Sequence, residues 1–357
     1  MLKKKMQLSF VVLALTAAVL FAISPANAVD FKISGQINRL AMYANDSETS
    51  KWFFADNANS STRFRFTGSE KFEKGWKVGI LWEVEMKSNP ANEVSMDNDD
   101  DTGDVDFNER HINFWIQKQN WGTMSLGQGD SASNGTSEVD LSGTDVAAYS
   151  SVDDIGGNFE FRDGDDKLGV TVGESRSNFD GFSRKDRIRY DTPTWAGFFA
   201  SASVMLKNRW DIAGRYSADF DWAKFAAAAA YSDYGTTNND RDKDWQASSS
   251  ASILFDFGLN LSAAYAYQDA EDDNPWNLFG KIGYKFLEKH AASVQYSRTE
   301  NRSADDDKGD TFGAAYVFSP WQSVELYGTY YLHMLEVDDG DDGDDIHIGV
   351  IGGRVKF

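Results

Sequence analysis

The 357-residue chain contains no cysteine and only five prolines, and both scarcities narrow the possible folds. A chain without cysteine does not use disulfides, and this suits an exported protein whose fold is stable without them. Little proline, together with 30 glycines and 14% aromatic residues, is typical of a strand-rich chain. No Pro-rich or Ser-rich linker divides the sequence, so we expect a single domain.

Long hydrophobic runs are equally scarce, and the clearest one stands at the start of the chain. Three lysines at positions 3–5 precede an apolar stretch from Leu8 to Ile23, which ends before the small residues of Pro25-Ala26-Asn27-Ala28. This arrangement predicts a signal peptide over residues 1–28, with a membrane anchor as the alternative interpretation. After residue 28 no apolar run approaches the ~20 residues of a spanning helix, which excludes a helical membrane protein.

Basic residues are outnumbered, because 35 Lys and Arg face 56 Asp and Glu and leave a net charge of −21. Nucleic-acid binding depends on lysine and arginine contacts to phosphate, so we expect no nucleic-acid partner. The mean hydropathy of −0.49 is compatible with a membrane β-barrel, whose strands alternate lipid-facing and water-facing residues.

Alternation with a period of two residues runs through most of the chain, and helical periodicity does not. In the stretch 276–286, Trp276, Leu278 and Ile282 share one face, and Asn277 and Lys281 share the other. A two-layer sandwich would alternate in the same way. The connections between the strands therefore have to distinguish a sandwich from a barrel.

Tight turns alternate along the sequence with longer, mostly acidic loops. Short turns at one end of the strands and long loops at the other are typical of a transmembrane barrel, whose closure satisfies every backbone group. We predict an all-β fold, a transmembrane antiparallel β-barrel of about 16 strands over residues 29–357. The expected strands are 31–43, 61–72, 75–87, 107–118, 121–130, 184–192, 196–207, 209–219, 222–234, 244–256, 258–268, 275–286, 289–299, 309–319, 321–336 and 345–357.

Tryptophan placement supports this interpretation, although tryptophans scattered in a core are the alternative. Five of the eleven tryptophans lie within a residue or two of a tight turn. Indole rings favour the membrane–water interface, so these five predict one rim of the barrel. They are Trp76, Trp121, Trp195, Trp222 and Trp321.

Three segments and the last residue resemble the general trimeric porins of Gram-negative bacteria. The segment Ser61-Thr62-Arg63-Phe64-Arg65-Phe66-Thr67-Gly68-Ser69-Glu70, continuing to Glu83-Val84-Glu85, looks like the second and third strands of that family. Residues 110–127 and 189–198 are similar to two further segments, and the chain ends on Phe357, as outer-membrane barrels commonly do. The resemblance covers the mature chain and implies a homotrimer in the outer membrane, in contact with its lipid, with a pore in each subunit.

The resemblance also implies a constriction, in which arginines on the barrel wall face carboxylates on an inward-folding third loop. Arg63 and Arg110 match the wall arginines of the family, and Gln36 departs from it, because lysine is frequent at that place. Mid-strand arginines should face the lumen, since a charge on the lipid face costs ~2–4 kcal/mol near the midplane. We therefore expect a basic wall, with simple pairing between neighbours as the alternative. Its candidate residues are Arg63, Arg65, Arg110, Arg187 and Arg189.

The longest connection, residues 130–185, occupies the place of the family's constriction loop. It holds twelve acidic and five basic residues, and loops of this length are usually functional or disordered. Leu168 to Val172 has the character of a strand and could pair with another segment. The expected pore-facing carboxylates are Glu138, Asp140, Asp145, Asp153 and Asp154.

Other motifs carry less weight. Residues 98–109 approach a calcium-loop pattern, for which Asn98, Asp100, Thr102 and Glu109 would be ligands, but strands flank it and a solvated acidic loop fits better. The four histidines show no metal spacing, and no Gly-x-Ser-x-Gly or phosphate-binding loop appears.

The sequence thus predicts a porin that is not an enzyme, needs no cofactor and lets small hydrophilic solutes and ions diffuse passively. Acidic loops favour cations and wall arginines favour anions, and we expect a weak preference for cations. A substrate-specific channel with a saturable lumen site for a sugar or an oxyanion is the alternative. A barrel lipid hydrolase is a remote alternative, supported only by the presence of serines.

Overall fold

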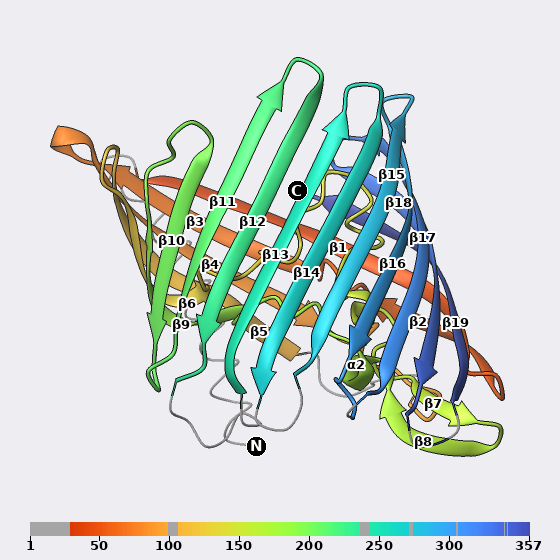
Figure 1. The fold of residues 1–357 in the computed structure, drawn as a ribbon. Helices are drawn as coiled ribbons and strands as arrows, with labels where there is room; N and C mark the ends of the chain where they lie inside the picture. The colour runs from red at the N-terminus through yellow and green to blue at the C-terminus, as the bar shows by residue number, and fades with distance from the viewer. Residues whose placement is uncertain are drawn as a thin grey trace, which may run out of the picture.

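A computed structural model of the chain describes residues 29–98, 106–235, 243–270, 274–304, 306–338, 340 and 342–357. The predicted signal peptide lies outside the described residues. Sixteen antiparallel strands form a tilted barrel around a lumen that contains irregular chain (Figure 1). They are β1 (Asp30–Asn45), β3 (Arg63–Lys71), β4 (Trp76–Lys87), β5 (Asp106–Lys118), β6 (Gly122–Asp130), β9 (Arg184–Asp191), β10 (Phe198–Met205), β11 (Trp210–Phe220), β12 (Ala223–Asp233), β13 (Lys243–Phe255), β14 (Leu259–Ala270), β15 (Trp276–Phe286), β16 (His290–Glu300), β17 (Lys308–Trp321), β18 (Val324–Glu336) and β19 (Gly343–Lys356).

The barrel closes because the first strand pairs with the last. β1 and β19 form an antiparallel ladder that runs from Gln36 opposite Lys356 to Asn45 opposite His347. The sheet has no free edge, so its backbone groups are satisfied between strands, as hydrocarbon surroundings require. The predicted fold, a closed antiparallel barrel of 16 strands, is confirmed. Within the described residues, no helix combines the length and the apolar character that a membrane span needs.

The two faces of each strand follow the alternation of the sequence. On β15, Leu278 and Ile282 are exposed on the outside of the barrel, whereas Asn277 and Lys281 are buried inside it. Aromatic rings mark the end with the short turns. There the rings of Trp76 and Trp121 lie 6.4 Å apart, and the Lys118 ammonium group lies over both of them.

Three strands occur in segments for which the sequence predicts loops. β2 (Ser50–Asp56) lies within the expected connection 44–60 and continues the pairing of β1 beyond β3, so the prediction of an unpaired loop there is wrong. β7 (Glu160–Asp163) and β8 (Asp166–Thr171) form a separate hairpin within the long loop, at the end of the barrel where the long loops lie (Figure 1). This hairpin accounts for the strand-like character of residues 168–172.

The segment between β6 and β9 passes through the interior of the barrel and builds an apolar core there. Phe159, Ile155 and Val146 from this segment pack against Phe53 and Ile348, which point inward from β2 and β19. Gly156 turns the chain at a φ of +79°, and a Cβ atom there would lie 2.1 Å from the Ile348 side chain. This core fills the part of the lumen beside β1, β2, β17, β18 and β19.

Candidate functional site: a charged constriction in the lumen

The constriction loop, defined here as residues 131–183, is attached along the inner wall by a row of serines. Ser250 and Ser252 on β13 point into the lumen, and their hydroxyls accept hydrogen bonds from the backbone amides of Val139 and Leu141, each at 3.0 Å. The same strand contributes Ser248, which lies 2.7 Å from the Thr136 hydroxyl. Alternate serines on one strand thus replace the backbone partners that the loop lacks, and they fix its path.

An ion pair and a buried arginine secure the loop further along. Lys281 of β15 donates to Asp140 at 2.7 Å and to the carbonyl of Ala148 at 2.5 Å. Arg176, which is 1% exposed, donates to the Thr311 hydroxyl at 2.8 Å and to the carbonyl oxygens of Asp310 and Met334. These contacts attach the loop to the wall at residues 140–148 and again at Arg176, so they hold it in a fixed position in the lumen.

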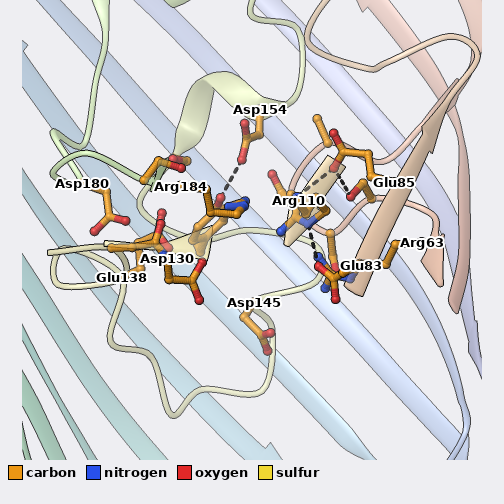
Figure 2. A pocket seen from close by; sticks show the side chains of 18 of the residues that line it. Arg63, Glu83, Glu85, Arg110, Asp130, Glu138, Asp145, Asp154, Asp180 and Arg184 are labelled. Carbon is orange, nitrogen blue, oxygen red and sulfur yellow. Dashed lines mark hydrogen bonds and ion pairs between the residues drawn. The ribbon is translucent and has the colours of Figure 1, made fainter. Parts of the chain in front are cut away.

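The loop leaves a polar cavity of about 730 Å³ between itself and the wall formed by β3, β4 and β5. The cavity is lined by charges of both signs, with Arg110, Glu83 and Glu85 on one side and Glu138 and Asp180 on the other (Figure 2). The charged lining residues are Arg63, Arg65, Lys87, Arg110, Arg184, Arg354, Glu83, Glu85, Asp130, Glu138, Asp145, Asp154 and Asp180.

Carboxylates on the wall side of the cavity neutralise two of its three arginines. Glu83 lies 2.5 Å from a guanidinium nitrogen of Arg65 and 2.8 Å from one of Arg110. Glu85 accepts a second hydrogen bond from Arg110 at 2.7 Å and one from the Ser61 hydroxyl at 2.6 Å. Among the described residues, Arg63 has no carboxylate within ion-pair distance. The wall is therefore a compensated cluster and not a purely basic surface.

The loop side holds its carboxylates with neutral donors. Asp180 accepts hydrogen bonds from the backbone amides of Gly135 and Ser137, Glu138 accepts one from the Asn178 amide, and Asp154 accepts one from the Tyr149 hydroxyl. Burial, and then the neighbouring charge of Asp180, raises the pKa of Glu138 well above its ordinary range. Burial likewise raises the pKa values of Asp154 and Asp180.

The structure brings six of the ten predicted site residues to the cavity. Arg63, Arg65 and Arg110 line it from the wall, and Glu138, Asp145 and Asp154 line it from the loop.

The other four predicted residues lie outside the lining. Arg187 and Arg189 share the inward phase but bind the chain where β6 passes into the loop, donating to the carbonyls of Asp130 and Ser131 at 2.8 and 2.7 Å. Asp140 is engaged by Lys281, and Asp153 lies in a short turn at Val152–Asp154.

Seven charged lining residues were not among the candidates drawn from the sequence. Glu83 and Glu85 alternate on one strand opposite the predicted arginines, and this phase could have identified them. Lys87 continues the inward phase of Glu83 and Glu85 on β4, and Arg354 points inward from β19, so the same signal could have identified both. Asp130 and Arg184 lie where β6 ends and β9 begins, next to the two ends of the loop. At these positions the alternation of the strand is a poor guide to where a side chain points. Asp180 is brought in by the path of the loop, which the sequence pattern does not encode.

The calcium-loop candidate is only partly described. Asn98 and Glu109 are described, whereas Asp100 and Thr102 lie outside the described residues. In the part of the chain that the structure covers, no three His, Asp or Glu side chains gather as metal ligands.

A protein-family model described as "Gram-negative porin" matches residues 14–350. No curated protein matches the chain. Solved structures match along nearly the whole length. The anion-selective porin from Comamonas acidovorans is 16% identical, with 92% of this chain and 100% of that chain covered and a TM-score of 0.66.

Two further structures show the same fold. The trimer form of OmpT, an outer membrane protein of Vibrio cholerae, is 14% identical over 93% of this chain and 100% of its own, with a TM-score of 0.58. OmpF of Salmonella typhi, in complex with daunomycin, is 15% identical over 92% of this chain and 98% of its own, with a TM-score of 0.58. At these identities the likeness concerns the fold alone.

Proposed function

The chain belongs to the Gram-negative porin family, and from this premise we propose that it works as a general diffusion pore for small hydrophilic solutes and ions. The observation that carries the proposal is the polar, charge-lined cavity beside a firmly attached loop in a closed barrel. A narrow zone of this kind selects by size and charge and needs no cofactor.

The charges of the cavity favour a weak preference for cations. Seven carboxylates and six Lys or Arg side chains line it, so neither sign dominates. On the wall, Arg65 and Arg110 are paired with Glu83 and Glu85, and Arg63 keeps its charge. On the loop, two carboxylates, Glu138 and Asp180, are held by amides and keep a net charge when ionised. Screening weakens charges beyond ~8 Å in physiological salt, so these lining groups outweigh the acidic outer loops.

The proposal includes the setting in which the pore works. The resemblance of the sequence to trimeric porins supports a homotrimer, embedded in outer-membrane lipid after removal of the signal peptide over residues 1–28. The trimer form reported for the Vibrio cholerae protein is in line with this arrangement. We propose no enzymatic activity, because the charged residues of the lumen are explained by the constriction that they build.

Solute flux into proteoliposomes tests the general pore against a substrate-specific channel. The general pore predicts that the swelling rate rises linearly with the concentration of each small sugar and falls smoothly with its size. Saturation of the flux by one sugar or oxyanion, with block of the conductance by the same solute, would establish the specific channel instead. Release of fatty acids from the liposome lipid would support the hydrolase.

A further inference from the structure

The second strand of the barrel is interrupted by six residues, 57–62, which we call the strand-two bulge. β1 pairs with β2 as far as Arg39 opposite Asp56, and it pairs with β3 from Gln36 opposite Arg63 onward. Between these two pairs β1 has two residues and the neighbouring strand has six. The four surplus residues cannot fit into the ladder, so they have to leave the plane of the sheet.

The bulge leaves the sheet toward the lumen. The side chain of Asn57 is fully buried there, and its amide donates to the carbonyl of Val146 on the constriction loop at 2.9 Å. The same amide lies 2.8 Å from the hydroxyl of Tyr327, which points inward from β18. The bulge therefore connects the constriction loop with the barrel wall.

Inward-facing side chains of the wall hold the bulge in place. The amide of Gln36 donates to the backbone and the hydroxyl of Ser60, at 3.1 and 2.8 Å, and to the carbonyl of Ser61 at 2.8 Å. Arg354 of β19 adds a hydrogen bond to the Ser60 hydroxyl at 2.8 Å. Gln36 is the residue at which the sequence departs from the porin pattern, and its amide holds Ser60 and Ser61 of the bulge by hydrogen bonds.

The other side of the bulge faces the cavity, because Ala58, Asn59, Ser60 and Ser61 all belong to its lining. Among the described residues, neither the nitrogen nor the oxygen of the Asn59 amide has a hydrogen-bond partner. Sheltered polar atoms in proteins are nearly always paired with protein, water or ligand. Both amide atoms of Asn59 are withdrawn from solvent although the residue lines the cavity, so a rotation of this side chain toward the cavity would present an unpaired donor and an unpaired acceptor to a solute.

We propose that the strand-two bulge is a second constriction element and that Asn59 is a specificity-determining residue within it. Its amide offers one donor group and one acceptor to uncharged solutes that carry hydroxyl or amide groups, such as small sugars. The proposal rests on the proposed function, since it concerns solutes in the pore. It assigns selection among neutral solutes to the bulge and selection by charge to the arginines and carboxylates.

The absence of native cysteine allows a direct test by thiol labelling in planar bilayers. Asn59→Cys is treated with a charged methanethiosulfonate reagent during single-channel recording, and Ala58→Cys provides a second position in the bulge. Phe54→Cys is the matched control, because Phe54 on β2 is 72% exposed on the outside of the barrel. We expect the reagent to lower the conductance of both bulge variants roughly twofold or more and to leave the control unchanged.

A second experiment tests the hydrogen-bonding role. Asn59→Leu keeps the side-chain size and removes both polar groups. The rate of liposome swelling in arabinose, divided by the potassium chloride conductance, should fall roughly three- to tenfold, the size of one or two hydrogen bonds. An equal fall in both quantities would mean that Asn59 only occupies space, and it would overturn this role.

The outcomes separate this inference from the proposed function. If the unmodified protein conducts and the reagent changes neither bulge variant, the bulge does not line the pathway and this inference fails alone. If the folded, unmodified protein carries no current, the proposed function fails first.

Discussion

Asp140 of the constriction loop lies 2.7 Å from the ammonium nitrogen of Lys281 on β15, and both side chains are withdrawn from solvent. The side chain of Lys281 is 0% exposed and that of Asp140 is 6% exposed. A predicted pore-facing carboxylate thus serves to fix the loop. The pair joins the constriction loop to the barrel wall, because Asp140 lies on the loop and Lys281 lies on β15. We therefore expect the rigidity of the cavity to depend on it.

Replacing Lys281 by Met should release the middle of the constriction loop. The change leaves the Asp140 carboxylate buried without its cation, which costs about 3–5 kcal/mol. Hydrogen exchange of the amides of residues 139–149 should accelerate, and the open-channel current should become noisier. The double variant Lys281→Met/Asp140→Asn should restore most of the protection. Unchanged exchange in the single variant would show that the serine row alone holds the loop.

The same ion pair gives the loop a defined response to acid. Burial by itself would raise the pKa of Asp140, but the Lys281 charge prevails and lowers it below its ordinary value. The stabilisation is therefore fully present above the ordinary carboxyl pKa, near 4, and is lost only as the pH falls through the lower folded value. We therefore expect no loss of exchange protection in the loop from pH 8 to pH 5, because the carboxyl groups with raised pKa values can only add stability as the pH falls. A loss of protection within that range would contradict the assignment.

Replacing Arg176 by Lys should loosen the end of the loop without unfolding the barrel. Arg176 binds three partners on β17 and β18 through a planar fork that lysine cannot reproduce, so we expect a loss of about 2–3 kcal/mol. Limited proteolysis within residues 172–183 should become faster. The control is Lys224→Met, which alters an exposed pair with Asp219 and should change stability by less than about 0.5 kcal/mol.

Cation preference should decline as the pH is lowered from 8 to 5. Burial raises the pKa values of three carboxyl groups that line the cavity, Glu138, Asp154 and Asp180. An acid with a raised pKa is negative only above that value, so these groups become neutral at a pH where exposed carboxylates remain charged. The reversal potential in a salt gradient reports the change. Glu138→Gln should flatten the curve, whereas a steep curve in that variant would assign the effect elsewhere.

Charge changes on the wall should shift selectivity in opposite directions. Arg110→Gln removes the cation between Glu83 and Glu85, so the permeability ratio of potassium to chloride should rise roughly threefold. Glu83→Gln leaves Arg65 and Arg110 less compensated and should lower the ratio by a similar factor. A shift of both variants in the same direction would show that the wall does not set the field in the narrow zone.

The sequence predicted the barrel well because a closed sheet in a membrane imposes a strict alternation that every strand repeats. The phase of Arg63, Arg65 and Arg110 followed from the same rule, since lipid excludes charge. The rule ends where the ladder ends. It could not show that Arg187 and Arg189 would turn to the carbonyls of Asp130 and Ser131, because these lie 57 and 58 residues away in the sequence, where β6 passes into the loop.

The strand-two bulge was missed for a related reason. Residues 57–60 are small and mostly polar, so they read as the end of an outer loop, and residues 61–62 read as the start of the next strand. β2, which precedes them, has too few residues to stand out. Only the register of two ladders on β1 shows that four residues are surplus. Glu138 and Asp180 likewise share the cavity because of the path of the loop, which depends on contacts with the inner wall.

Recording single channels of the folded protein in a planar bilayer, with a tenfold gradient of potassium chloride, tests the central claim most directly. The account predicts stable, ohmic conductance steps and a small reversal potential of cation sign at neutral pH. Folded barrels that insert into the bilayer but carry no current would contradict a pore. A reversal potential of anion sign would contradict the balance of charges assigned to the constriction.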